Sequence, residues 1–501
     1  MGILFNNEHK PKSNVILSEN LLDDMEIKEF LHRYFDHPEQ YLTCDIDSIK
    51  ERNEICKALI ENDELTVALQ NFCDVVELMN ATNKDSDDEP INTIHRIIFI
   101  NDFFNAVDEV IKEIEANDHL SPYFNKVHST LRNLIIENFP LNFKEIIEMN
   151  CSGVENPAGI SYHVKFDDDV SIDSIAITGI HCKKYKKLTI LKRIMAPDKS
   201  MYVNSLLSLD SDPASDVLQV FSPDRKFTNR ERFQNEINNI LILQSITLKK
   251  QIISMERNIL HEIEMLTDEL HFALGMVQYS KALDYRCFAD IAKPEDRLLH
   301  VNEAAHPLLS ERAEVVTNNI LIQNGSDFIL LGGINQGGKT SYLRTIGAIQ
   351  IFFQMGLPLP ARYAKISPVS GIYAVFSRKE KTDFYKSKFE DELIELRDNI
   401  ENLDKESLFL CNEPISGTSF TESYFLSRDA LCMIKSKCAR GIWVTHLYEL
   451  FDDVNTLNNF NFGSCFACMK TDTLDNKFTY KITHGIPVKN SGAQEMFELR
   501  L

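Results

Sequence analysis

The stretch LLGGINQGGKTSYLR, residues 330–344, decides the fold of the carboxyl-terminal part of the chain. Gly333, Gly338, Lys339 and Thr340 have the spacing G-x-x-x-x-G-K-[ST], with an apolar run before them and a helical pattern after them. In such a loop the backbone N–H groups point toward a phosphate, and the amino end of the helix adds positive potential. The stretch therefore predicts a strand, a phosphate-binding loop and a helix. The alternative is a glycine-rich turn with an exposed lysine.

The loop and the first helical turn form the predicted nucleotide site. Its residues are Gly333, Ile334, Asn335, Gln336, Gly337, Gly338, Lys339, Thr340 and Ser341. We expect Lys339 to reach the terminal phosphates and Thr340 to bind Mg²⁺. The sequence therefore predicts a nucleoside triphosphate and Mg²⁺ as cofactors, with a catalytic role for Lys339.

Two apolar runs farther along the chain also end in polar residues. SLFLCNEPISGTS places Asn412 and Glu413 after one run, and GIWVTHLYEL places Thr445 and His446 after the other. A carboxylate at Glu413 is suited to orient or deprotonate the water that attacks a terminal phosphate. A histidine at position 446 is suited to sense or polarise that phosphate. The alternatives are a helix-flanking charge for Glu413 and a structural role for His446.

Together these segments resemble the ATPase of the MutS family of DNA mismatch-repair proteins, a branch of the ABC-type fold. The matching motifs follow one another in the family's order: GGINQGGKTSYLR (332–344), QMGLPLPA (354–361), SKFEDEL (387–393), NEPISGTS (412–419) and THLYEL (445–450). His306, Pro307 and Asn318 also lie at matching places upstream. The resemblance is specific because several motifs agree in both order and spacing.

The resemblance implies an ATP-hydrolysing enzyme that works as a homodimer. Ser387 would complete the nucleotide site of the opposite subunit, although a serine in this setting is by itself also a common helix N-cap. Thr340, Asn412 and Glu413 would hold Mg²⁺, partly through water, and Glu413 and His446 would serve catalysis. Asn412 stands where the family has an aspartate. Its amide oxygen can accept a hydrogen bond from metal-bound water but carries no negative charge, so we expect weaker Mg²⁺ coupling and slow turnover.

The predicted fold is an α/β P-loop ATPase of ABC/MutS type at the carboxyl terminus, preceded by an all-α lever and core domain with a small inserted β-rich module. Helical periodicity, short β-like runs and a long segment without Gly or Pro mark the boundaries. The predicted domains are a first helical core part (1–150), the β-rich module (151–225), long lever helices (226–298) and the ATPase (299–501). The acidic segment 83–92 is expected to be a solvated loop.

Composition limits the partners and the location of the protein. The 501 residues carry a formal net charge of -22, so that any DNA contact must come from a local basic patch. The chain shows neither an apolar amino-terminal signal nor a run long enough to cross a membrane, which predicts a cytoplasmic protein without membrane contact. The 11 cysteines fit reduced thiols, and the pair Cys465 and Cys468 fits core packing, with a metal or redox site as the alternative.

The densest basic run, HCKKYKKLTILKR (181–193), lies in the β-rich module. Its basic side chains and tyrosine suit a nucleic-acid backbone. Possible DNA contacts are Lys183, Lys184, Lys186 and Lys187. The alternative is a solvated loop that balances the acidic FDDDV segment (166–170).

Two functions follow from these observations. One is an ATP-dependent dimeric clamp that acts on DNA structures in repair or recombination. The other is an ATP-gated protein-interaction scaffold that does not bind DNA, which the negative charge favours. We find no match to the family's mismatch-recognition domain, its carboxyl-terminal helix-turn-helix or an Smr nuclease tail, so reading of single mismatches is not expected.

Overall fold

The structure is a computed structural model. It describes residues 13–82, 90–117, 120–138, 159–166, 172–181, 257–310, 315–377, 388–415, 417–460, 462–474 and 477–487. The chain divides into two compact units, Met1–Glu61 with His271–Leu501, and Asn62–Leu270. No helix within the described residues combines the length and the apolar character that crossing a bilayer requires.

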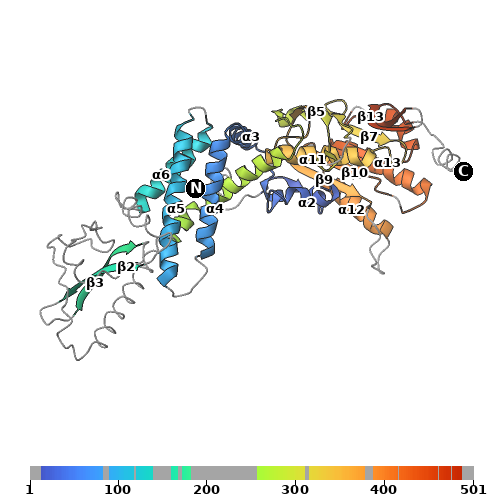
Figure 1. The fold of residues 1–501 in the computed structure, drawn as a ribbon. Helices are drawn as coiled ribbons and strands as arrows, with labels where there is room; N and C mark the ends of the chain where they lie inside the picture. The colour runs from blue at the N-terminus through green and yellow to red at the C-terminus, as the bar shows by residue number, and fades with distance from the viewer. Residues whose placement is uncertain are drawn as a thin grey trace. The chain divides into compact units, whose positions relative to one another are not determined.

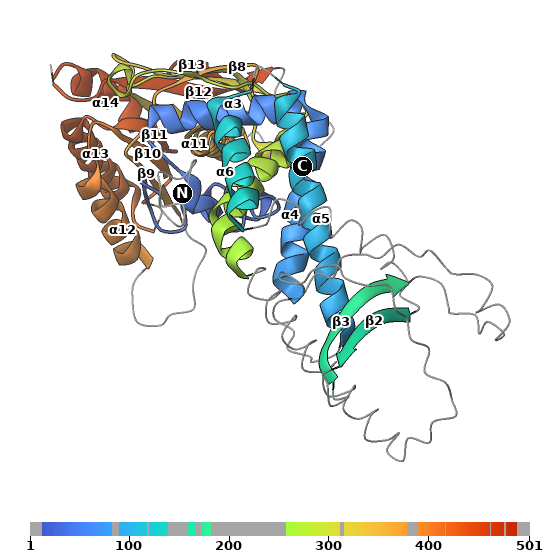
Figure 2. The same cartoon turned by 90° about the vertical axis from the view of Figure 1, so that its left-hand side faces the viewer.

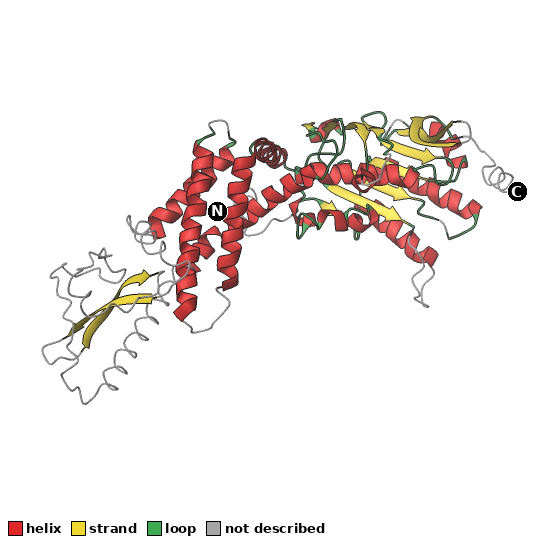
Figure 3. Ribbon diagram, viewed as in Figure 1, coloured by secondary structure: helices red, strands yellow, loops and turns green. Residues whose placement is uncertain are grey.

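A seven-stranded sheet forms the centre of the first unit (Figures 1 and 3), in the order β1-β9-β10-β11-β7-β12-β13. Neighbouring strands run parallel except for the final hairpin of β12 and β13. The strands are β1 (Ile16–Leu17), β7 (Phe328–Gly332), β9 (Gly371–Phe376), β10 (Ser407–Asn412), β11 (Arg440–Val444), β12 (Phe466–Leu474) and β13 (Lys477–His484). The alternating strands and helices expected in this region therefore do form a mixed α/β fold with a parallel sheet.

Helices cover both faces of this sheet, which explains why its central strands are apolar throughout. Figure 2 shows α11 (Lys339–Met355) on one face and α12 (Lys388–Asn402) and α13 (Phe420–Lys437) on the other. Successive side chains of β10 alternate between these layers. Phe409 and Cys411 join the core beside α12 and α13, whereas Leu410 faces α11, where a Cβ added at Gly347 would lie 2.8 Å from it.

A smaller sheet lies in the same unit, in the order β4-β8-β5-β6. Its strands are β4 (Asp290–Ile291), β5 (Leu299–Ala304), β6 (Asn318–Ile322) and β8 (Tyr363–Ile366), accompanied by η2 (Pro294–Asp296) and α10 (Pro307–Ser310). Ser367 and Pro368 follow β8, and their carbonyls accept hydrogen bonds from Arg440 at the start of β11. This buried arginine therefore bonds the small sheet to the central one.

The amino-terminal segment belongs to the same unit, which the sequence pattern did not indicate. Its elements are β1, α1 (Leu21–Asp24), α2 (Lys28–Leu31), η1 (Pro38–Tyr41) and α3 (Ile46–Glu61). β1 extends the central sheet by pairing with β9, and Nε of Arg344 on α11 donates to the Asp24 carbonyl. Residues 271–281 of a helix described over 257–281 complete the unit.

The second unit is helical where its side chains are described. It contains α4 (Asp63–Thr82), α5 (Pro90–Glu115) and α6 (Pro122–Asn138), with α4 against α5 and α5 against α6. Of the predicted acidic loop, residues 90–92 begin α5 and residues 83–89 lie outside the described residues. β2 (Gly159–Phe166) and β3 (Ile172–His181) form an antiparallel hairpin within the predicted β-rich module. Most of that module and residues 226–256 of the predicted lever also lie outside the described residues, so the domain boundaries stay a prediction.

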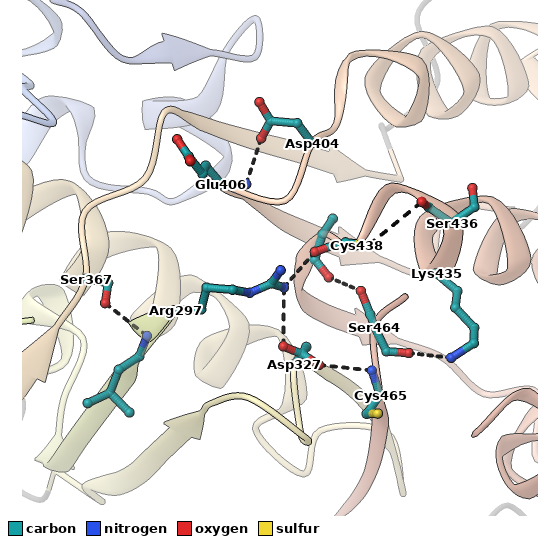
Figure 4. A network of polar contacts seen from close by, with 12 residues as sticks. Arg297, Asp327, Ser367, Asp404, Glu406, Lys435, Ser436, Cys438, Ser464 and Cys465 are labelled. Atoms are coloured by element: carbon teal, nitrogen blue, oxygen red, sulfur yellow. Dashed lines mark hydrogen bonds and ion pairs between the residues drawn. The ribbon is translucent and has the colours of Figure 1, made fainter. Parts of the chain in front are cut away.

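A polar network holds the amino ends of the central strands together (Figure 4). Arg297 donates a hydrogen bond to the carbonyl of Cys438 at 2.6 Å and forms an ion pair with Asp327 at 3.3 Å. Asp327 directly precedes β7, and its second oxygen accepts a hydrogen bond from the backbone of Cys465, which precedes β12. One guanidinium and one carboxylate thus connect the starts of β7, β11 and β12.

Candidate functional site

The predicted phosphate loop connects the end of β7 to the start of α11. Gly333 has φ 134° and Gly338 has φ 91°, values that favour glycine. The close approach of Thr471 on β12 also requires small residues here. A Cβ at Gly333 would overlap the Thr471 hydroxyl, and a Cβ at Gly337 would lie 2.9 Å from the Thr471 methyl carbon. The glycines of the motif therefore serve both the turn and its packing on the sheet.

Lys339 lies inside this loop and is only 5% exposed. Its Nζ donates hydrogen bonds to the carbonyls of Gly333 at 3.0 Å and Ile334 at 3.1 Å. Burial lowers the pKa of Lys339, and the negative charge of Glu413 acts in the opposite direction. The ammonium group is thus held by loop carbonyls, partners that the anionic oxygens of a phosphate are able to replace.

Thr340 and Asn412 meet across the site. Oγ1 of Thr340, in the first turn of α11, donates to Oδ1 of Asn412, at the end of β10, with 3.2 Å between the oxygens. Hydroxyl, amide and carboxylate oxygens are the donors that Mg²⁺ prefers. Thr340, Asn412 and the adjacent Glu413 therefore offer a donor set that fits Mg²⁺ and its bound waters.

Glu413 and His446 form a pair at the ends of β10 and β11. Nε2 of His446 donates to Oε1 of Glu413 at 2.6 Å, and both side chains are about one third exposed, 36% for His446 and 34% for Glu413. Burial by itself would raise the pKa of Glu413. The hydrogen bond and charge of His446, with the charge of Lys339, outweigh burial and hold this pKa below its usual value. Glu413 is therefore a carboxylate at neutral pH.

The strand register explains why these residues converge. Val444 is paired with Leu331 on one side and with Asn412 on the other, so that β7, β10 and β11 end at the same level. The Thr445 amide donates to the Leu331 carbonyl directly beyond this pairing. The carboxyl edge of a parallel sheet is where ligands bind in open α/β folds.

Other predicted site residues have different surroundings. Asn335, Gln336 and Ser341 are exposed on the loop and the first turn of α11. Ser387 directly precedes α12 and lies outside the described residues, as do the four candidate DNA-contact lysines.

The pair Cys465 and Cys468 lies at the start of β12, and both thiols are free. Cys468 packs against the hydrophobic core. Nowhere in the described ranges do three or more His, Cys, Asp or Glu side chains form a group able to hold a metal ion.

Sequence reasoning missed the part of the β12–β13 hairpin that lies beside the loop. Tyr480 has φ 57° and is half-exposed, and its ring would be 3.6 Å from a Cβ at Gly338. Asn318 of β6 fixes this part of β13. Its Nδ2 donates to the Tyr480 carbonyl at 3.0 Å, and its Oδ1 accepts from the Ile482 amide at 2.8 Å. Only Asn318 carried a signal in the sequence, as one of the matched family positions.

Comparison with known proteins agrees with this geometry. Residues 329–497 match the family model of MutS domain V. The chain is 25% identical over 444 residues to Endonuclease MutS2 of Lactobacillus helveticus (strain DPC 4571), which covers 84% of this chain and 51% of that protein. It is 23% identical over 405 residues to DNA mismatch repair protein MutS of Macrococcus caseolyticus (strain JCSC5402), which covers 74% of this chain and 44% of that protein.

A second Endonuclease MutS2, from Ligilactobacillus salivarius (strain UCC118), is 27% identical over 268 residues, 51% of this chain and 33% of that protein. The chain thus spans about half the length, or less, of these curated relatives. The matches confirm the predicted resemblance: residues 329–497 are similar to MutS domain V, and most of the chain is similar to proteins of the MutS family.

Proposed function

We propose that this protein binds and hydrolyses ATP with Mg²⁺ at the carboxyl edge of its central sheet. The observation that carries the proposal is the convergence of Lys339, the Thr340–Asn412 pair and the Glu413–His446 pair at one strand level. In this proposal the loop N–H groups and Lys339 bind the phosphates. Glu413 orients or deprotonates the attacking water, and His446 senses the terminal phosphate. Mg²⁺, when bound, would neutralise phosphate charge and fix the orientation of the triphosphate.

Calorimetric titration with ATP and Mg²⁺ tests the proposal directly. We expect binding by the wild-type protein and at least about a hundredfold weaker binding by Lys339→Ala, because charge-assisted hydrogen bonds to phosphate are lost. The structure supplies a control in Lys437→Ala, since Lys437 is a partly exposed lysine on α13 whose Nζ donates to the Glu401 carbonyl. No heat from ATP at millimolar concentration in the wild-type protein would contradict the proposal.

We propose further that Asn412 makes hydrolysis slow. It holds the Thr340 hydroxyl through its amide oxygen, which has the geometry but not the charge of a carboxylate. Nucleotide binding before hydrolysis relies mainly on the loop and Lys339. Asparagine in place of aspartate at position 412 therefore affects Mg²⁺ coupling more than nucleotide affinity.

A dimer is proposed because the motif that begins at Ser387 would act on the nucleotide of a second copy. The described start of α12 lies beside the loop that follows Glu413: Phe389 is 3.5 Å from a Cβ added at Gly417, and Oγ of Ser377 donates to Oε1 of Glu392 at 3.5 Å. This motif is thus attached to the catalytic edge. Sedimentation with and without ATP tests dimer formation, which Lys339→Ala should abolish.

The proposed partner is DNA, in a repair or recombination process, because one named relative is a DNA mismatch repair protein and others are endonucleases. The basic run begins at His181, the last residue of β3. Filter binding across a salt series, with a variant in which Lys183, Lys184, Lys186 and Lys187 are all alanine, tests this step. Retention that falls steeply with salt and is lost in the variant supports DNA binding. No retention at low salt would favour the alternative, an ATP-gated protein scaffold, which the net charge of -22 supports.

A further inference from the structure

The carboxyl end of α11, opposite the phosphate loop, is bonded to the amino-terminal segment. The Thr43 amide donates to the Gln354 carbonyl at 2.9 Å, and Nε2 of Gln354 donates to the Thr43 carbonyl at 3.2 Å. Gln354 is fully buried and also bonds Val369 in both directions. The last turn of α11 is therefore fixed to residue 43, which lies just ahead of α3.

Arg52 of α3 meets the same helix end. Its Nη1 donates to the carbonyls of Tyr41 and Met355, the latter at 3.3 Å. Gly356 ends α11 with φ 79°, and a Cβ there would lie 2.6 Å from Cβ of Arg52. A positive charge at this end of a helix is favourable because it faces the negative end of the helix dipole.

Burial of the Arg52 guanidinium carries a desolvation cost. The side chain is 5% exposed, and burial lowers its pKa to about 10. It makes no ion pair with a carboxylate among the described residues, and its Nε has no hydrogen-bond partner there. Arg52 is thus held by main-chain carbonyls rather than by a counterion.

The helix over residues 257–281 is attached to the same place by aromatic contacts. The Arg52 guanidinium lies 5.3 Å from the ring centre of Phe272, and Tyr41 stacks on this ring with 4.1 Å between the ring centres. About two turns later Tyr279 packs against Phe352 of α11, with 5.4 Å between the ring centres. This helix therefore contacts α11 directly through Tyr279 and indirectly through Arg52, which bonds the Met355 carbonyl.

The contacts around Arg52 lie close to the two positions where the chain enters and leaves the second unit. The second unit begins at Asn62, directly after α3, and ends at Leu270, two residues before Phe272. One connection to that unit thus follows the helix that carries Arg52, and the other belongs to a helix that contacts Arg52. We propose that Arg52 is a positioning residue that couples the nucleotide state of the phosphate loop to the unit of residues 62–270.

The coupling follows from the rigidity of α11. The helix starts at Lys339 and ends at Met355, so its ends lie on the order of 25 Å apart at 1.5 Å per residue. A displacement of its amino end on phosphate binding moves the whole helix, and packed interfaces respond by switching between discrete arrangements. Arg52 passes that movement to both chain connections at once. This inference rests on the proposed nucleotide binding.

Hydrogen exchange of the full chain, with and without ATP and Mg²⁺, tests the coupling. In the wild-type protein we expect nucleotide to change exchange in peptides from α4, α5 and α6. In Arg52→Gln the change should fall by at least three quarters, while the Kd for ATP stays within threefold. Arg440→Gln is the matched control, because Arg440 is also buried, also donates to two main-chain carbonyls and also has a pKa lowered to about 10, but lies at the start of β11. This control should keep the full response.

Any other outcome of the hydrogen-exchange experiment would contradict the proposed coupling. An unchanged response in Arg52→Gln shows that the residue does not transmit, and an equal loss in Arg440→Gln shows general destabilisation. If Arg52→Gln does not fold, Phe272→Leu removes the ring contacts to Arg52 and Tyr41, keeps the Arg52 hydrogen bonds to α11, and should lose the response in the same way. A wild-type protein that binds ATP without any change in the second unit refutes this inference alone, whereas one that does not bind ATP refutes the proposed function and the coupling with it.

Discussion

The two edges of the central sheet carry similar charged groups in different settings. At the amino edge Arg297 and Asp327 are 15% and 10% exposed, and Arg297 also bonds the main-chain carbonyl of Cys438. At the carboxyl edge Glu413 and His446 are about three times more exposed, and they bond each other through side chains. The first pair is sealed between strand ends, whereas the second lies where a ligand is able to replace its contacts.

Backbone conformation does not separate the two edges. Glu413 at the carboxyl edge has φ 50°, and two residues of the amino-edge network have similar values, Arg297 at 52° and Cys438 at 57°. Left-handed backbone is therefore not sufficient to mark a functional site in this fold. Solvent access and the type of bonding partner distinguish the site from the structural network.

The largest effect is expected from Asp327→Ala at the amino edge. Removing this carboxylate leaves Arg297 buried without its counterion, which should cost about 3 kcal/mol of unfolding free energy. Trp443, the only tryptophan and fully buried in β11, reports unfolding by its fluorescence in a denaturant series. The control Glu401→Ala breaks an exposed ion pair with Arg397 and should cost less than about 0.5 kcal/mol. If Asp327→Ala instead weakens ATP binding more than tenfold with little loss of stability, the separation between the two edges is wrong.

A smaller effect is expected at the carboxyl edge from Asn412→Asp. The carboxylate supplies the negative charge that the amide lacks, so ATP hydrolysis should become several-fold faster and should need less Mg²⁺. Steady-state rates across a Mg²⁺ series measure both quantities. Asn412→Ala, which removes the bond to Thr340, is the control and should lower the rate. An unchanged or slower rate in Asn412→Asp would show that the missing charge does not limit turnover.

The smallest effect concerns the pH dependence of the Glu413–His446 pair. The pKa of Glu413 lies below its ordinary value of 4.5, so its contribution to stability is fully present above that pH and is lost as the pH falls through the lower, folded value. Glu413→Gln should therefore lose less stability than the wild-type protein between pH 7 and pH 3. The difference should be small because both side chains are partly solvated. Glu303→Gln removes an exposed partner of Arg362 and serves as the control. An equal acid response in Glu413→Gln and the wild type would argue against the pair.

The local pattern of the sequence was sufficient for the phosphate loop and its helix. Gly333 and Gly338 adopt the positive φ values of a tight loop and Lys339 begins α11, as their spacing predicts, because loop conformation and helix start depend on neighbouring residues. The strands that end at Asn412 and Val444 were also predictable, since a sheet covered on both faces requires continuous apolar runs. The pairing of Thr340 with Asn412 needed the family resemblance in addition.

By itself the sequence determined the elements of the phosphate-loop edge and the resemblance to the MutS family. Tertiary structure alone decided that Ile16 and Leu17 extend the sheet, that Thr471 and Tyr480 lie against the phosphate loop, and that Arg52 meets the end of α11. These contacts join residues that are far apart in the chain. Their side chains show no periodicity of their own, because their partners are main-chain carbonyls and glycines whose positions only the folded chain fixes.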